Sequence, residues 1–141
     1  MKSSLVIALA DEVTAKLNGL DIAGIKLSAV RKLIVEQKLP STRDLFCICV
    51  PHALESKIIT RGKTKERLIS VDVGIFKRCR ENEIADLVTL VETVGDLLEA
   101  ATYKTGVVLG VEYAPIYDVN MFLQQGTFFA RLSVNFKVFC K

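Results

Sequence analysis

The residues best suited to chemistry in this sequence are four cysteines and one histidine. Cys47 and Cys49 lie two positions apart in the run LFCICV, which places both side chains on one face of a strand. A structural zinc site needs a second closely spaced pair of ligands, whereas Cys79 and Cys140 are isolated in the sequence. We therefore interpret the four thiols as small apolar side chains in a reducing compartment, where disulfides are rare.

No catalytic motif accompanies the single histidine. His52 follows Pro51, where we expect a strand to end, and no serine or cysteine nucleophile motif surrounds it. A surface or helix-capping histidine is the better interpretation. The segment GKT at 62–64 resembles the end of a phosphate-binding loop, but the glycine required five positions earlier is Lys57. We expect a protein that is not an enzyme and that holds no cofactor or metal.

Charge is distributed unevenly along the chain, although the net charge is only +3. Residues 57–80 contain eight basic residues and two acids, and residues 81–101 contain six acids and no base. Such opposed patches favour head-to-tail contact between copies; the alternative is a pair of solvated faces. The candidate contact residues are three bases at a predicted turn and three acids on one flank of a predicted helix: Arg61, Lys63, Lys65, Glu92, Asp96 and Glu99.

These charged groups are positioned by two predicted helices. The four-residue spacing of Leu5, Leu9, Val13 and Leu17 predicts a helix over 3–17, ended at Asn18-Gly19 by a left-handed glycine. Residues 81–100 have apolar side chains at helical spacing, and their acids begin where the positive end of the helix dipole lies. Residues 118–125 are expected to form a polar connection or a single helical turn.

Alternating and continuous apolar runs predict the strands. We expect strands at 26–35, at 45–50 and at 106–113, with the second buried on both faces, ended by Pro51 and central in the sheet. Residues 67–77 alternate apolar and polar side chains after the polar turn 61–65, so 58–77 is predicted to be a β-hairpin with a basic tip.

The clearest strand is the last one, residues 127–139. Its even positions are apolar and its odd positions are mostly polar, which predicts one core face and one wet face. Phe129 and Phe139 interrupt the polar face, so we expect this face to be partly covered by a helix or by another subunit.

Composition supports one ordinary domain. The 141 residues are 50% apolar with a mean hydropathy of +0.35, and no apolar run reaches the length of a membrane-spanning helix. Asp11 and Glu12 interrupt the first apolar run, so we expect a cytosolic product without a signal peptide. The predicted fold is a single α+β domain over 1–141, with an antiparallel-rich sheet packed by two main helices and a protruding basic β-hairpin.

The order of these segments resembles the tail terminator and tail completion proteins of long-tailed phages. The resemblance rests on FCICVP followed by the basic hairpin and ISVDVGIFKR, on EIADLVTLVETVGDLL, and on the closing VEYAPIYDVNMFLQQGTFFARLSVNFKVF. It covers nearly the whole chain, whereas 22–40 matches only as a generic strand. Each pattern alone is mostly apolar periodicity, and the combination in this order carries the specificity.

The resemblance implies a structural virion protein. Such a protein closes the head-proximal end of the tail tube as a ring, with six copies implied, and provides the surface for head-tail joining. The implied partners are further copies, the tail tube protein and head connector or neck proteins, with DNA passing through the ring without sequence-specific binding. The implied location is the virion tail or neck, and the host cytoplasm during assembly. Two alternatives stay open: another neck or head-completion protein, and a small nucleic-acid-binding module that uses the basic hairpin.

Overall fold

The computed structural model describes residues 4–22, 25–33, 45–58, 65–114 and 117–140. The helices are α1 (Leu5–Asn18), α2 (Ile84–Ala100) and α3 (Val119–Gln125), and a 3-10 turn at Glu81–Glu83 leads into α2. The strands are β1 (Asp21–Ile22), β2 (Ile25–Lys26), β3 (Ser28–Arg31), β4 (Phe46–Ile58), β5 (Lys65–Arg78), β6 (Val107–Tyr113) and β7 (Thr127–Cys140).

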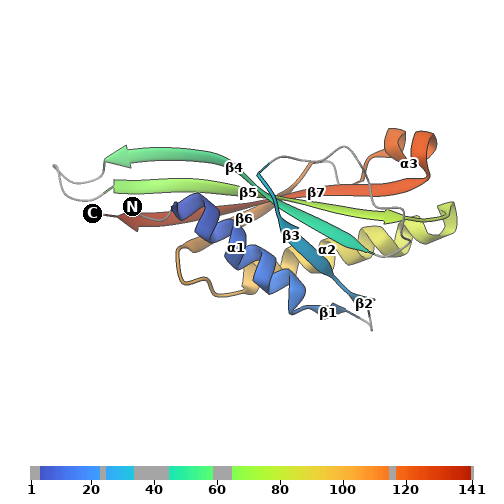
Figure 1. The fold of residues 1–141 in the computed structure, drawn as a ribbon, viewed down its shortest axis with the longest axis horizontal. Coiled ribbons are helices and arrows are strands. Elements are labelled where there is room, and N and C mark those ends of the chain that lie inside the picture. Colours follow the sequence, from blue (N-terminus) through green and yellow to red (C-terminus); the bar gives the residue numbers. More distant parts are fainter. Residues whose placement is uncertain (1–3, 23–24, 34–44, 59–64, 115–116, 141) are drawn as a thin grey trace.

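One five-stranded sheet organises the chain, in the order β3-β4-β5-β7-β6. The β3–β4 pair is parallel and the other three pairs are antiparallel. Both long helices lie on the same side of this sheet, with α1 across β3, β4 and β5 and α2 across β6 and β7 (Figure 1). The predicted α+β fold with an antiparallel-rich sheet and two main helices is therefore confirmed.

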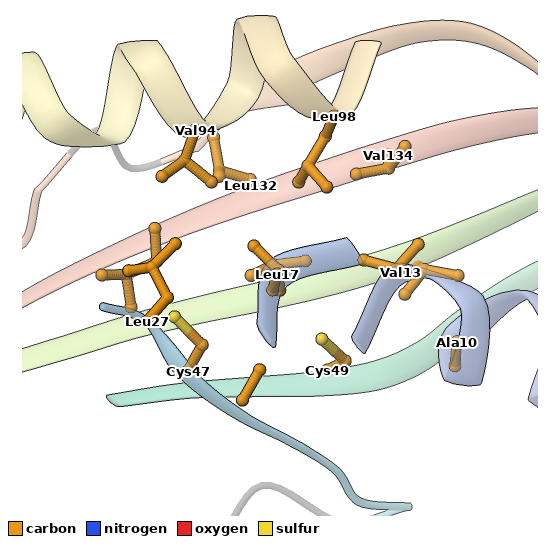
Figure 2. Packing of buried hydrophobic residues seen from close by; sticks show 14 of the residues in the cluster. Ala10, Val13, Leu17, Leu27, Cys47, Cys49, Val94, Leu98, Leu132 and Val134 are labelled. Carbon is orange, nitrogen blue, oxygen red and sulfur yellow. The ribbon is translucent and has the colours of Figure 1, made fainter. Parts of the chain in front are cut away.

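The core fills the space between this sheet face and the two helices. Every even position of β7 from Phe128 to Val138 is buried, as the alternation predicted. Val94 and Leu98 of α2 lie over β7, and Val13 and Leu17 of α1 lie above β4 and its two thiols (Figure 2). The opposite face of the sheet, which we call the open face, carries the odd positions of β7 and has neither long helix over it.

Helix α1 follows its predicted wheel, with Leu9, Val13 and Leu17 fully buried. The prediction that Gly19 ends the helix in a left-handed conformation is wrong, because Gly19 has φ −89° and its N–H continues the helical hydrogen bonding to the Ala15 carbonyl. The helix end is instead tied to β3 by a side chain. Asn18 donates from Nδ2 to the carbonyl of Ala29 at 3.0 Å and accepts the Ala29 N–H at 2.8 Å.

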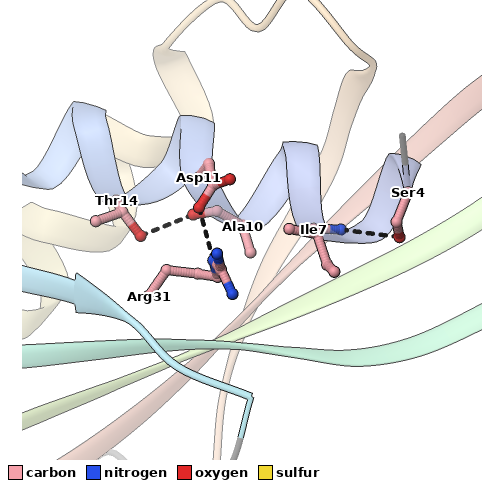
Figure 3. A network of polar contacts seen from close by, with 6 residues as sticks. All are labelled: Ser4, Ile7, Ala10, Asp11, Thr14 and Arg31. Carbon is pink, nitrogen blue, oxygen red and sulfur yellow. Dashed lines mark hydrogen bonds and ion pairs between the residues drawn. The ribbon is translucent and has the colours of Figure 1, made fainter. Parts of the chain in front are cut away.

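Polar contacts hold the outer side of α1 in place. Ser4 accepts the Ile7 N–H at the first turn, and Asp11 pairs with Arg31 of β3 at 2.7 Å (Figure 3). The carboxylate of Glu12 accepts the N–H groups of Lys104 and Thr105, at 2.8 and 3.2 Å. These contacts join α1 to β3 on one side and to the segment before β6 on the other.

Strand β4 differs from the prediction in two ways. It runs on through Pro51 to Ile58, with a bulge between Pro51 and Ala53, and its inner position between β3 and β5 holds only for Phe46–Cys49, because β3 ends there. Proline is tolerated at this point because β3 pairs with β4 only as far as Cys49, so the missing N–H faces an edge without a partner strand among the described residues. The expected burial on both faces holds for Cys47, Ile48 and Cys49.

Three smaller predictions are refined. The strand predicted at 26–35 is two short strands, β2 and β3, and residues 34–35 lie outside the described part of the chain. Residues 119–125 form the short helix α3, which ends at Gly126 with a left-handed φ of 63°. Thr127, placed on the wet face of the last strand, is buried.

The predicted hairpin consists of β4 and β5, and their last paired residues are Ile58 and Lys65. Residues 59–64, which form its tip, lie outside the described residues. Strand β7 also pairs with β5 to the end, Lys65 lying opposite Cys140. The protruding element is therefore a three-stranded arm (54–58, 65–68 and 137–140), which extends past the start of α1 in Figure 1.

Candidate assembly interface

Of the three basic residues predicted at the hairpin tip, the structure describes one. Arg61 and Lys63 lie outside the described residues, whereas Lys65 is the exposed first residue of β5. On the open face of the same arm, Lys137 pairs with Glu66 at 3.0 Å. Lys65 therefore stands at the base of a tip whose positive charge is known from the sequence.

The basic run 57–80 is divided by the structure, which the sequence did not indicate. Lys65 and Arg67 belong to the arm, whereas Lys77, Arg78 and Arg80 lie at or just beyond the other end of the 14-residue strand β5. At about 3.3 Å per strand residue, the two groups are roughly 40 Å apart. The second group lines a recess of about 570 Å³ together with Asn82 and Glu83. Lys77 approaches the Glu83 carboxylate at 3.9 Å.

The three predicted acids, Glu92, Asp96 and Glu99, are all exposed on α2. We call them the acidic flank. This flank borders the edge strand β6 through Tyr113, whose hydroxyl donates to the Glu92 carbonyl at 3.4 Å. Burial raises the pKa of Tyr113, and the negative charges of Asp96, Glu99 and Glu92 raise it further. The acids are thus close enough to Tyr113 to act on it electrostatically.

A glycine in α2 allows the close approach of β6 to the acidic flank. A Cβ added at Gly95 would lie 2.0 Å from the Tyr113 hydroxyl oxygen. Glycine in a helix interior costs about 1 kcal/mol of helix stability relative to alanine. At Gly95 this cost allows Tyr113 to pack directly against α2. The sequence pattern gives no sign of this contact, because the two residues belong to elements that come together only in the folded chain.

The two aromatic residues of the wet face lie in different surroundings. Phe129 is half-buried and stacks on Phe76, its neighbour on β5, with ring centroids 4.8 Å apart, so this contact lies within the sheet and does not test the expected cover by a helix or another subunit. Phe139 is 57% exposed at the arm, where the Lys137 ammonium lies 5.8 Å from its ring centre. Ten strand residues, roughly 33 Å, separate the two.

The middle of the open face between them is polar. Ser70 donates to Asn135 at 2.7 Å, and Ser133 donates to Asp72 at 2.6 Å. The predicted surface position of His52 is confirmed, since its side chain is 58% exposed, and its Nδ1 lies 3.2 Å from the second carboxylate oxygen of Asp72. Ser133 and His52 therefore bind opposite oxygens of one carboxylate and do not contact each other as a nucleophile and base would.

The thiols of Cys47 and Cys49 lie on one face of β4, as their spacing predicted; this is the core face, and both side chains are fully buried. Burial raises the pKa of Cys47 to about 12, with a contribution from Cys49, and raises that of Cys49 to about 11. Within the described residues, no group of three or more potential ligands could hold a metal ion. At neutral pH the two thiols behave as small apolar side chains.

No helix in the described parts of the chain is long and apolar enough to cross a membrane. No protein-family model matches the sequence, and no curated protein matches it.

Proposed function

We propose that the protein is a phage tail terminator, a non-enzymatic virion protein that caps the head-proximal end of the tail tube as a ring of about six copies. The ring would offer one side to the tube protein and the other to the head connector, and DNA would pass through its centre. The order of segments in the sequence suggested this family, and the arrangement of charge and exposed surface supports it.

The observation that carries the proposal is that opposite charges lie at two different places on the subunit, the exposed acids on α2 and the exposed Lys65 at the base of the basic hairpin. The acidic flank borders β6 at one edge, whereas the basic hairpin begins in β4, which forms the other edge beyond Cys49. A subunit with complementary charges on two different surfaces associates head to tail, and head-to-tail contacts close into a ring when the rotation between copies allows it.

The exposed arm is a second source of support. Phe139, Leu68 and Leu54 are exposed apolar side chains on or beside a three-stranded arm that extends past α1. Apolar groups of this size on a protruding arm are suited to burial against another protein chain.

The proposal is tested by binding to tail tubes that lack this protein. Purified protein is mixed with such tubes, the tubes are pelleted, and their ends are imaged by negative-stain electron microscopy. The proposal requires pelleted protein and a ring at one end of each tube. Protein that stays in the supernatant, and that light scattering shows to be monomeric at assembly concentrations, would overturn it.

A second candidate, a nucleic-acid-binding module, is favoured by the recess at Lys77, Arg78 and Arg80. Phosphate binding by such a cluster weakens steeply with salt. Duplex DNA binding that is lost in an Arg78→Glu/Arg80→Glu variant, together with failure to bind tubes, would replace the first candidate with this one.

A further inference from the structure

A basic recess lies at the end of β5 that is opposite the arm in Figure 1. Its volume is about 570 Å³, and its charged lining residues are Lys77, Arg78, Arg80 and Glu83. Among the described residues, the lining therefore carries three cations and one acid, an excess of two positive charges.

The single acid of this lining is already engaged by the protein. Glu83 accepts the Arg80 backbone N–H at 2.7 Å through Oε2, and its Oε1 lies 3.9 Å from the Lys77 ammonium. Arg78 and Arg80 are exposed, and neither guanidinium has an ion-pair partner in the part of the chain that the structure describes. The excess charge of the recess is thus carried by two arginines that are available to a ligand.

The backbone places these two arginines on the same side of the chain. Cys79 continues the pairing of β5 with the start of β7 by one residue, because its N–H donates to the Gly126 carbonyl at 3.2 Å. Arg80 is also extended, with φ −97° and ψ 161°. Side chains two positions apart on an extended chain project from the same side, so Arg78 and Arg80 lie together and Lys77 lies on the other side.

The recess is open where it meets the turn from α3 into β7. Gly126 makes this turn with a left-handed φ of 63°, and a Cβ added there would have no atom within 4 Å. Because no side chain fills this point, a bulky anion can approach the two guanidinium groups.

The ligand that suits this arrangement is the phosphodiester backbone of a nucleic acid. Guanidinium groups bind phosphate oxygens through paired N–H donors, and the amide of Asn82, which also lines the recess, adds a neutral donor. Contacts with phosphate groups position a duplex without reading its bases. They therefore suit DNA that passes a protein without sequence-specific binding.

We propose that this recess binds backbone phosphate groups of the DNA enclosed by the ring, through Arg78 and Arg80. The inference rests on the proposed function, which supplies the enclosed DNA, and adds which surface of each subunit faces it. The basic hairpin tip, which begins at Lys65 at the other end of β5, is then left for protein contacts.

The test is the salt dependence of DNA binding. Two labelled duplexes of unrelated sequence are titrated with protein, and the affinity is measured by fluorescence anisotropy between about 50 and 200 mM salt. Arg78→Gln/Arg80→Gln removes two positive charges at exposed positions. Lys16→Gln/Lys104→Gln is the matched control, because both lysines are exposed and neither lines the recess.

Each phosphate contact contributes about 0.9 to the slope of log affinity against log salt concentration, so two contacts account for about a tenfold loss of affinity across this range. The slope of Arg78→Gln/Arg80→Gln should therefore be smaller by about two for each subunit in contact with the duplex. The wild type and the control should share the larger slope and bind both duplexes equally. Arg78→Lys/Arg80→Lys keeps the charge and should keep the slope, which separates loss of phosphate contacts from loss of structure.

Three results would overturn the inference. The first is a wild type that does not bind DNA, and the second is an unchanged slope in Arg78→Gln/Arg80→Gln. The third is a variant that binds DNA normally but no longer binds tail tubes, because it would assign the two arginines to a protein contact.

Tube binding separates failure of the inference from failure of the proposed function. Wild-type rings on tubes, with a DNA slope that does not depend on Arg78 and Arg80, would overturn the phosphate site and leave the terminator proposal standing. Protein that binds DNA through the two arginines but never binds tubes would support the site and count against the terminator role. Tube binding that persists in Arg78→Gln/Arg80→Gln while DNA binding weakens would support both.

Discussion

The junction between Gly95 and Tyr113 gives a quantitative prediction, because it fixes the acidic flank against the edge strand. In Gly95→Ala, a Cβ 2.0 Å from the Tyr113 hydroxyl oxygen must reach ordinary contact at about 3.4 Å, so roughly 1.4 Å of movement is required. Overpacking of this kind costs about 1–3 kcal/mol, against a gain of about 1 kcal/mol in helix propensity.

The prediction is a coupling energy rather than a single stability change. In a Tyr113→Leu background the hydroxyl and the distal ring atoms are absent, so Gly95→Ala should stabilise the protein by about 1 kcal/mol. The free energies of unfolding of the wild type, both single variants and the double variant are measured by urea denaturation and combined in a double-mutant cycle. We expect a coupling of about 1–3 kcal/mol; additive effects would show that Tyr113 does not lie against Gly95.

Two further predictions concern the core. Phe136→Asp or Leu132→Asp should prevent folding, because both side chains are fully buried and an unpaired buried carboxylate costs several kcal/mol of a total stability of about 5–15 kcal/mol. Lys137→Ala should lose the partly exposed Glu66 pair and the contact with the Phe139 ring, and keep a cooperative melt. A soluble Phe136→Asp protein that melts cooperatively would refute the assigned register of β7. At alkaline pH the stability should fall, because the pKa of Cys47 is raised from 9.0 to about 12 and that of Tyr103 from 10.0 to about 12 in the folded state. The contribution of these two groups to the free energy of unfolding is fully present below their unfolded pKa values and is lost as pH rises from about 9 to 12. The melting temperature, measured from pH 7 to pH 11, should therefore be constant to about pH 8.5 and then decline. A constant melting temperature throughout would contradict the assigned burial.

Local periodicity predicted most of the elements correctly. The even positions of β7 and the four-residue steps of α1 depend on side chains that face one core, so their pattern survives in the sequence. Pro51 misled the prediction because a proline ends a strand only where its missing N–H is needed, and that depends on how far β3 extends. Gly19 misled it because Asn18, bound to Ala29, ties down the end of the helix.

The candidate interface was less predictable than the fold. The acidic flank follows directly from helical spacing, but its position at the sheet edge depends on the contact of Tyr113 with α2. The basic run was treated as one patch, whereas β5 separates Lys65 from Arg78 by its full length. The first point depends on a long-range contact between β6 and α2, which a single sequence does not carry, and the second depends on the extended length of β5.

The central claim is that copies associate head to tail through opposite charges, and a charge-swap series tests it most directly. Light scattering after size-exclusion chromatography gives the mass of the wild type, of Arg61→Glu/Lys63→Glu/Lys65→Glu, of Glu92→Lys/Asp96→Lys/Glu99→Lys, and of the variant that carries both sets. Exposed ion pairs contribute only about 0–1 kcal/mol each, so neither triple change should alter the melting temperature by more than a few degrees. The account predicts a ring of about six copies for the wild type, monomers for each triple variant, and partial return of the ring when both sets are reversed. Rings of unchanged mass in both triple variants would contradict it.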